Sequence, residues 1–372
     1  MDARKLRTAL IGLKGDAPTV LDALASSDLF HLVAVADSDT KLAERIAADQ
    51  NCKPFDDYRQ LVMSCNPANF SDDPPTIDQS LQQSQNPLDC LIVVSGLHSC
   101  GEHIRTAVKK GIHVLKLAPS ARCFEEAAEF VRLTNSQKTT FAIANPLRCA
   151  ESFSALDKYL TENYIEGVFT FSAALNIPDT QIPSWHTDPK LSGGGVLLQN
   201  CFPFIDQITK NFSIPSQVYC LTTSHLADKK QRNYKTEDSV TLTMKFSDDS
   251  FGHLTASRIF GPQKLELTIN LTDKIITVTD SEFKITSLTG QKIVRKKFKD
   301  DSTSRMKKAL EIFALTLISP EENKLQSSAR ENLANMAVIE AAYLSARTAM
   351  PEDPGKILHL ARIEQENIWS IL

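Results

Sequence analysis

Apolar and polar positions in the first 146 residues alternate between two periods. Short apolar runs predict strands at 6–13, 31–37, 88–95, 112–117 and 139–144. The segments between them have the spacing of amphipathic helices, which we expect up to about residue 27 and at 41–50, 103–110 and 124–137. Strands that alternate with helices predict a doubly wound parallel sheet of the α/β class.

The pattern changes after Pro146. We expect helices at 149–163 and after the glycines at 193–195, and strands at 167–175, 217–225, 239–246, 252–259, 265–271, 274–279 and 283–289. Late helices are expected at 303–318 and 325–349. A run of strands after one or two helices predicts an α+β domain with a large, open, mostly antiparallel sheet. The predicted domains are therefore 1–146 and 147–372.

Residues 66–87 interrupt the first domain. They are rich in Pro, Asp, Ser and Gln, so they can bury little apolar area and predict a surface excursion. A tolerated insertion is favoured here over a binding loop.

Composition narrows the function classes. The chain has 372 residues, 42% hydrophobic and 23% charged, with a net charge of -4, which favours neither nucleic acid nor an acidic membrane surface as a partner. No apolar run approaches the ~20 residues that span a bilayer, and the first residues lead directly into a strand-like run, so we expect neither a membrane segment nor a signal peptide. Eight cysteines lack metal-binding spacing, which predicts reduced thiols, no metal and a cytoplasmic protein.

The turn after the first strand has part of a dinucleotide-binding motif. In 12–17 (GLKGDA), Gly12 suits the tight turn and Ala17 suits close packing of helix on strand, with Leu13 between them in the loop. Lys14 takes the position at which a second glycine would let the backbone approach a pyrophosphate. Its side chain obstructs that approach and adds a cation that partly compensates.

Asp37 follows the second predicted strand. A carboxylate there can bond a ribose 2′-hydroxyl and repels a 2′-phosphate, so NAD is favoured over NADP. The alternative is that Asp37 only caps the end of the strand.

Three further segments resemble the glucose–fructose oxidoreductase / inositol dehydrogenase / MocA (Gfo/Idh/MocA) family. Residues 185–195 (WHTDPKLSGGG) are similar to the family's W-x-x-D-P-x-x-S-G-G-G motif, and 237–239 (EDS) and the late helix near 335–347 also fit. The resemblance implies an N-terminal Rossmann domain and a C-terminal domain whose open sheet forms homo-oligomers, dimers or tetramers. It also implies oxidation or reduction of a sugar- or polyol-like ligand with NAD or NADP, with Ser95, Gly96 and Pro119 beside the cofactor.

The resemblance also shows where the chain departs from the family. The lysine of the family's E-K-P loop aligns with Ala118, and the aspartate and histidine of the substrate-domain helix align with Gln199 and Pro203. The family's P-x-x-x-H becomes Gly96 and Cys100. Neither alanine nor proline can transfer a proton, and loss of general acid–base help costs ~10²- to 10⁴-fold in rate. We also expect Pro203 to kink the helix at its middle.

Other residues are candidates for the missing proton transfer. Lys116 lies two residues before Ala118, on the same side of a strand, and its side chain could cover much of the gap. The favoured alternative is that Lys116 caps a strand edge or pairs with a carboxylate. His98 and His186 lie in loops where histidine can act or be incidental. Arg148 suits an anionic ligand or an interdomain salt bridge.

Two functions remain open. One is an NAD(P)-dependent oxidoreductase of sugars or polyols whose standard catalytic lysine and histidine are replaced. The other is a catalytically inactive sensor or scaffold that binds NAD(P) or a sugar on the same fold. A ligand-free oligomeric interaction protein ranks last, since Gly12, Ala17 and Asp37 would then be remnants.

Overall fold

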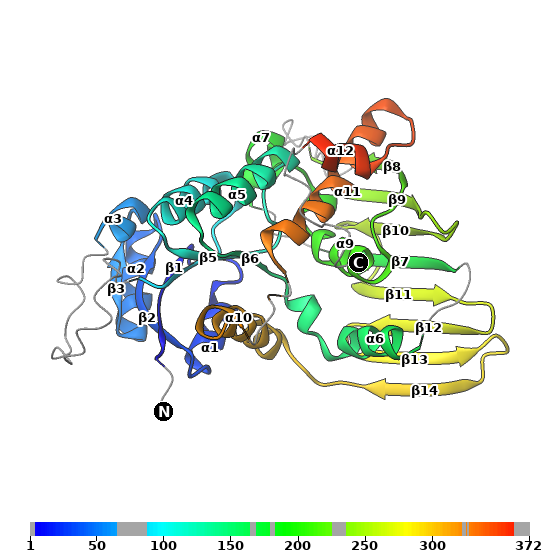
Figure 1. Cartoon of the computed structure of the whole chain (residues 1–372), viewed down its shortest axis with the longest axis horizontal. Coiled ribbons are helices and arrows are strands. Elements are labelled where there is room, and N and C mark those ends of the chain that lie inside the picture. The colour runs from blue at the N-terminus through cyan, green and yellow to red at the C-terminus, as the bar shows by residue number, and fades with distance from the viewer. Residues whose placement is uncertain are drawn as a thin grey trace. The chain divides into compact units, whose positions relative to one another are not determined.

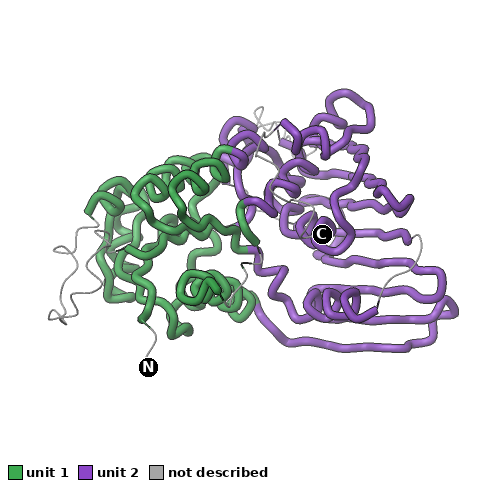
Figure 2. Tube along the Cα trace, in the orientation of Figure 1, with its two compact units in different colours: residues 1–117, 129–144, 302–329 green, residues 118–128, 145–301, 330–372 purple. Residues whose placement is uncertain are grey.

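The computed structural model of the chain describes residues 4–64, 88–163, 169–178, 183–224, 236–321, 325 and 327–360. The predicted excursion at 66–87 lies outside the described residues. Two compact units, coloured in Figure 2, share the chain. Unit 1 comprises Met1–Leu117, Glu129–Ala144 and Ser302–Ala329, and unit 2 comprises Ala118–Ala128, Asn145–Asp301 and Arg330–Leu372.

Unit 1 contains the predicted parallel sheet (Figure 1). Its order is β3-β2-β1-β4-β5-β6, with strands β1 (Leu6–Ile11), β2 (Phe30–Ala36), β3 (Lys53–Phe55), β4 (Cys90–Val93), β5 (His113–Leu117) and β6 (Phe141–Ala144). Every pair is parallel, so the doubly wound α/β prediction is confirmed. Because β1 lies between β2 and β4, the strand order reverses at β1, which is where open α/β sheets bind ligands.

Helices cover the sheet of unit 1. They are α1 (Ala17–Ala25), α2 (Thr40–Gln50), α3 (Tyr58–Met63), α4 (Leu97–Lys109), α10 (Ser302–Ile318) and most of α5 (Phe124–Gln137). The sequence order groups α10 with the second domain, but α10 packs on α1, and its Leu310 and Phe313 share a core with Leu10 and Val20. The apolar face of α10 therefore packs in the core of unit 1, although α10 follows the strands of unit 2 in the sequence. The single predicted boundary near residue 146 stays a prediction.

Unit 2 is built on an eight-stranded sheet of order β14-β13-β12-β11-β7-β10-β9-β8. The strands are β7 (Thr170–Asn176), β8 (Gln217–Thr223), β9 (Ser239–Lys245), β10 (Phe251–Ser257), β11 (Lys264–Asn270), β12 (Lys274–Thr279), β13 (Glu282–Ser287) and β14 (Lys292–Lys297). All neighbours are antiparallel except β7 and β10, which confirms the mostly antiparallel prediction. Burial alternates along β8, β9 and β10, so one face of this part of the sheet is exposed.

The helices of unit 2 include two short 3₁₀ turns. They are η3 (Pro146–Cys149), α6 (Glu151–Glu162), η4 (Ser184–Thr187), α7 (Pro189–Ser192), α8 (Val196–Gln199), α9 (Phe202–Phe212), α11 (Ala329–Thr348) and α12 (Pro354–Leu360). The expected kink at Pro203 is wrong, because α8 and α9 are separate helices. Pro203 lies in the first turn of α9, where its missing N–H needs no partner. Among the described helices, none is long and apolar enough to cross a membrane.

The glycine run before α8 lets the backbone pass between buried groups. A Cβ on Gly194 would overlap the Tyr343 hydroxyl, and one on Gly195 would overlap the carbonyl oxygen of Glu237. The Glu237 carboxylate accepts hydrogen bonds from the backbone N–H of Gly195 (2.9 Å) and Leu197 (3.0 Å) and from the Tyr343 hydroxyl (2.8 Å). Burial raises the pKa of Glu237, although these donors oppose that shift. Glycines are therefore needed at 194 and 195 because the backbone there packs closely around the buried Glu237 and its partner Tyr343.

We expect Gly195→Ala to destabilise the protein by about 2 kcal/mol or more, because the added methyl must displace backbone atoms. Gly355→Ala is the matched control, since the nearest atom to its Cβ is the end of the Asp353 side chain. Urea unfolding of both variants measures the difference. Equal stability would show that the backbone at 195 and 237 can separate without penalty.

Candidate functional site

The carboxyl ends of β1, β2 and β4 meet at the point where the strand order of unit 1 reverses. Ile11 pairs with both Ala36 and Val93, so the turns after the three strands start at the same level. Gly12 follows with a φ of 86°, and a Cβ there would overlap the backbone nitrogen of Ser95. Glycine is thus needed for the left-handed conformation and for the approach of the loop after β4.

Asp37 is fixed at this corner by two backbone donors. Its Oδ2 accepts from Leu13 N (2.8 Å) and its Oδ1 accepts from Asp39 N (2.9 Å). The carboxylate therefore ties the end of β2 to the glycine turn, which goes beyond capping its own strand. Each carboxylate oxygen keeps a further lone pair that can accept from a ligand hydroxyl.

Lys14 extends towards the start of α2. Its ammonium Nζ lies 3.5 Å from Asp39 Oδ2, and both side chains are largely exposed. Asp39 also caps α2 by accepting from Leu42 N (3.2 Å). Ala17, the third small position of the motif, is fully buried where α1 begins.

A serine–histidine pair that sequence reasoning missed lies next to Gly12. Ser95 Oγ is 2.9 Å from His103 Nδ1, and His103 is only 7% exposed. The Tyr58 ring packs on the imidazole with centroids 4.1 Å apart. Burial, aided by the charge of nearby His98, lowers the pKa of His103 to about 4, so the ring is neutral near pH 7. No sequence motif marks position 103, which is the seventh residue of α4.

His98, Gly96 and Cys100 lie at the start of α4. Gly96 is the N-cap, His98 is exposed, and Cys100 is buried. Partial burial lowers the pKa of His98. Among the described residues, no group of three or more His, Cys, Asp or Glu side chains could hold a metal ion.

Lys116 is buried at the carboxyl end of β5. Only 3% of it is exposed, and its Nζ donates to the carbonyl of Leu117 (2.7 Å). The ammonium therefore turns towards the end of the strand, where the chain continues into the cis Ala118-Pro119 bond. This contact agrees with a lysine that caps the strand edge, and a role of Lys116 in proton transfer stays a prediction.

Gln199 and Pro203, which align with the family's aspartate and histidine, both make hydrogen bonds within unit 2. Gln199 Nε2 donates to Ser192 O (2.6 Å), and the carbonyl of Pro203 accepts from Asn145 Nδ2 (3.3 Å). His186 lies in η4 with its ring edge against Trp185, the centroids being 3.9 Å apart. The Gln199 side chain thereby links the end of α8 to the end of α7.

Arg148 is held inside unit 2. Its Nε and one terminal nitrogen each lie 2.6 Å from a carboxylate oxygen of Asp206, and both residues are buried. Asn145 and Asn335 donate to the same carboxylate at 2.6 and 2.7 Å. The partner is therefore within unit 2, and we assign Arg148 to a structural ion pair rather than to an anion site.

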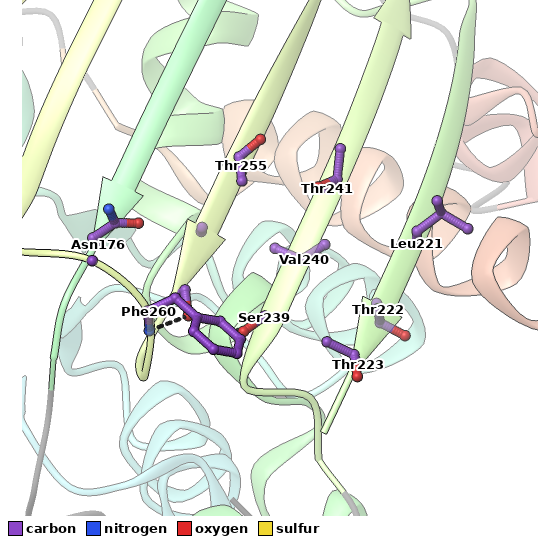
Figure 3. Close-up of a pocket in the computed structure, with 12 residues that line it drawn as sticks. Asn176, Leu221, Thr222, Thr223, Ser239, Val240, Thr241, Thr255 and Phe260 are labelled. Atoms are coloured by element: carbon purple, nitrogen blue, oxygen red, sulfur yellow. Dashed lines mark hydrogen bonds between the residues drawn. The ribbon is translucent and has the colours of Figure 1, made fainter. Parts of the chain in front are cut away.

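A cavity of about 420 Å³ lies on the sheet of unit 2, at the ends of β7, β8 and β10 and the start of β9 (Figure 3). Strand pairing brings Asn176, Ser257, Ser239 and Thr223 into one row across four strands. Phe260 lies beside this row, and its backbone N–H donates to Ser257 Oγ (2.9 Å). None of the residues selected from the sequence lines this cavity.

Two family models match the chain. The oxidoreductase family model with an NAD-binding Rossmann fold matches residues 6–145, and the GFO/IDH/MocA C-terminal domain model matches residues 153–277. No curated protein matches the chain at a level that identifies a relative.

Solved structures are similar over nearly the whole chain. The WlbA dehydrogenase of Bordetella pertussis, in complex with NADH and UDP-GlcNAcA, has a TM-score of 0.75 at 15% identity, covering 94% of this chain and 99% of its own. A levoglucosan dehydrogenase with NADH and levoglucosan has a TM-score of 0.79 at 16% identity, with the same coverages. A putative NADPH-dependent oxidoreductase of Desulfitobacterium hafniense has a TM-score of 0.79 at 15% identity, covering 95% and 99%. At these identities the likeness shows the fold alone.

We expect acid to destabilise the protein partly through His103. Its pKa falls from 6.5 in the unfolded chain to about 4 in the folded one, so the unfolded state binds more protons between these values. The stability present above pH ~6.5 is then lost as the pH falls towards 4, by about 2–3 kcal/mol. His103→Gln, which keeps a partner for Ser95 but cannot titrate, should reduce that loss in urea unfolding at pH ~7 and ~4.5. Exposed His31→Gln is the control, and equal acid sensitivity of the two variants would contradict this.

Proposed function

The chain belongs to the Gfo/Idh/MocA oxidoreductase family, and on that premise we propose that it oxidises or reduces a sugar- or polyol-like molecule with NAD(P), using Lys116 for proton transfer. The observation that carries the proposal is the buried side chain of Lys116, two positions before the alanine that replaces the family lysine. Its Nζ donates to the carbonyl of Leu117 at the end of β5. The ligands named for the similar structures support this substrate class.

The corner of unit 1 fits a dinucleotide. The Gly12 turn, the close start of α1 at Ala17 and the anchored Asp37 carboxylate supply three features of such a site, and Lys14 stands at the fourth, where the motif has a second glycine. Leu13, Ser95 and Gly96 are proposed to line the same site, and the cofactor contact of Pro119, which lies in unit 2, stays a prediction. When bound, NAD(P) supplies the carbon that accepts or donates the hydride.

Lys116 would act through its Nζ atom, which would exchange a proton with the substrate hydroxyl. Oxidation of an alcohol carbon releases a hydride and, from the hydroxyl, a proton. The uncharged amine Nζ of Lys116 would accept that proton, and the ammonium would return it in the reverse direction. Burial excludes water from the amine and holds it near the strand end. His98 and His186 remain secondary candidates, and Ala118, Gln199 and Pro203 contribute no proton.

A non-catalytic sensor or scaffold that binds NAD(P) or a sugar is the second candidate. The contacts of two replaced positions favour it, because Gln199 bonds Ser192 O and Pro203 begins α9. Both residues serve local structure at places where the family has chemistry.

Homo-oligomers through the sheet of unit 2 are also proposed. On β8 and β10 the exposed face carries Tyr219, Leu221 and Phe251, and Phe260 lies beside it. Apolar side chains on the open face of a sheet are typical of a protein interface. We further place the protein in the cytoplasm, in keeping with the free thiols of its described cysteines.

If Lys116 transfers the proton, Lys116→Met should lower turnover by ~10²-fold or more with little change in NADH binding. Methionine keeps the stem in the buried strand, so folding should survive. The measurement is NADH formation with a panel of anhydrosugars, sugar acids and polyols, beside an NADH fluorescence titration. Exposed Lys109→Met on α4 is the matched control.

Unchanged turnover in Lys116→Met would remove Lys116 from the mechanism. Saturable NADH binding without turnover of any panel member by the unaltered protein would favour the sensor. No saturable binding of NADH or NADPH would contradict both functions.

If the sheet face joins two copies, Leu221→Glu should shift the protein to a smaller species in size-exclusion chromatography with light scattering, because a charge would be buried at the interface. Leu288→Glu is the matched control. Leu288 lies in the turn after β13 and is 61% exposed, close to the 59% of Leu221. A monomeric unaltered protein, or equal masses for all three proteins, would exclude this interface.

A further inference from the structure

Given the cofactor role proposed above, we propose that Asp39 sets cofactor selectivity by pairing with Lys14. The pair withholds from a 2′-phosphate the ammonium that would otherwise bind it, so the site prefers NAD(H) to NADP(H). Asp39 is thus a specificity residue distinct from Asp37, which bonds the ribose.

The geometry places all three groups at one corner. Asp37 accepts from Asp39 N and from the N–H of Leu13, the residue before Lys14, so the backbone that carries the cation and the backbone that carries the second carboxylate both lie beside Asp37. The Lys14 ammonium lies 3.5 Å from Asp39 Oδ2. A 2′-phosphate replaces the hydroxyl that Asp37 would bond, so it would enter the space next to this pair.

The charges of Asp37, Asp39 and Lys14 then decide the preference between NADH and NADPH. With Asp39 present, two carboxylates face one ammonium, and a 2′-phosphate dianion meets net repulsion. Without the Asp39 charge, one ammonium remains against Asp37, and the flexible lysine stem can turn to the phosphate. NADH lacks that phosphate, so its affinity should hardly depend on the pair.

Asp39→Asn isolates this effect, because asparagine caps helices as well as aspartate and should leave α2 intact. We expect the dissociation constant of NADPH, from fluorescence titration, to fall about five- to tenfold while that of NADH changes less than about twofold. Asp37→Ala should weaken NADH more than NADPH. Asp49→Asn, exposed at the other end of α2, gives the same change in net charge and should leave the ratio unaltered.

Lys14→Gln in the Asp39→Asn background tests the cation directly, and the gain for NADPH should disappear. A gain that persists in this double variant, or an NADH/NADPH ratio unchanged by Asp39→Asn, overturns the selectivity role while NADH binding and the proposed function stand. Failure of the unaltered protein to bind either nucleotide overturns the proposed function and the selectivity role together.

Discussion

The close approach of two backbone segments, at Gly12 and Ser95, is the constraint on which the site of unit 1 depends. No side chain fits at position 12, so the turn after β1 and the loop after β4 meet at the point where the strand order reverses. That contact brings Ser95 and its partner His103 beside the glycine turn, and it leaves Leu13 N directed at Asp37. Because position 12 is glycine, the Asp37 carboxylate, the Ser95 hydroxyl and the start of α1 can all lie beside the same turn.

Both units bury charged side chains. In unit 2, Asp206 and Glu237 are surrounded by donors, and each holds together chain segments that are far apart in sequence. Such fully bonded carboxylates contribute to a single, defined packing. Lys116 of unit 1 is a buried cation at the carboxyl end of a parallel strand, where enzymes of this architecture place their chemistry. That location and its burial are the observations on which the proposed role of Lys116 rests.

The residues chosen from the sequence met different outcomes in the structure. The Lys14 ammonium lies 3.5 Å from Asp39 Oδ2 at the start of α2, and its predicted obstruction of a pyrophosphate stays a prediction. Arg148 was expected to bind an anion or to bridge domains, and it pairs inside unit 2. Pro203 does not kink a long helix, because it lies in the first turn of α9, which begins at Phe202. In each case the neighbour that decided the outcome lies far away in sequence or at a helix end that periodicity locates poorly.

Periodicity alone determined the fold class. The alternation of periods in the first part, and the run of strands in the second, define a parallel and a mostly antiparallel sheet, and the motifs at 12–17 and 185–195 indicate the family. Only tertiary structure decided that α10 packs with unit 1, that Ser95 bonds His103, and that Asn176, Ser257 and Ser239 share a row. The physical reason is that local patterns specify which face of an element is apolar, whereas register and long-range packing decide which element covers that face.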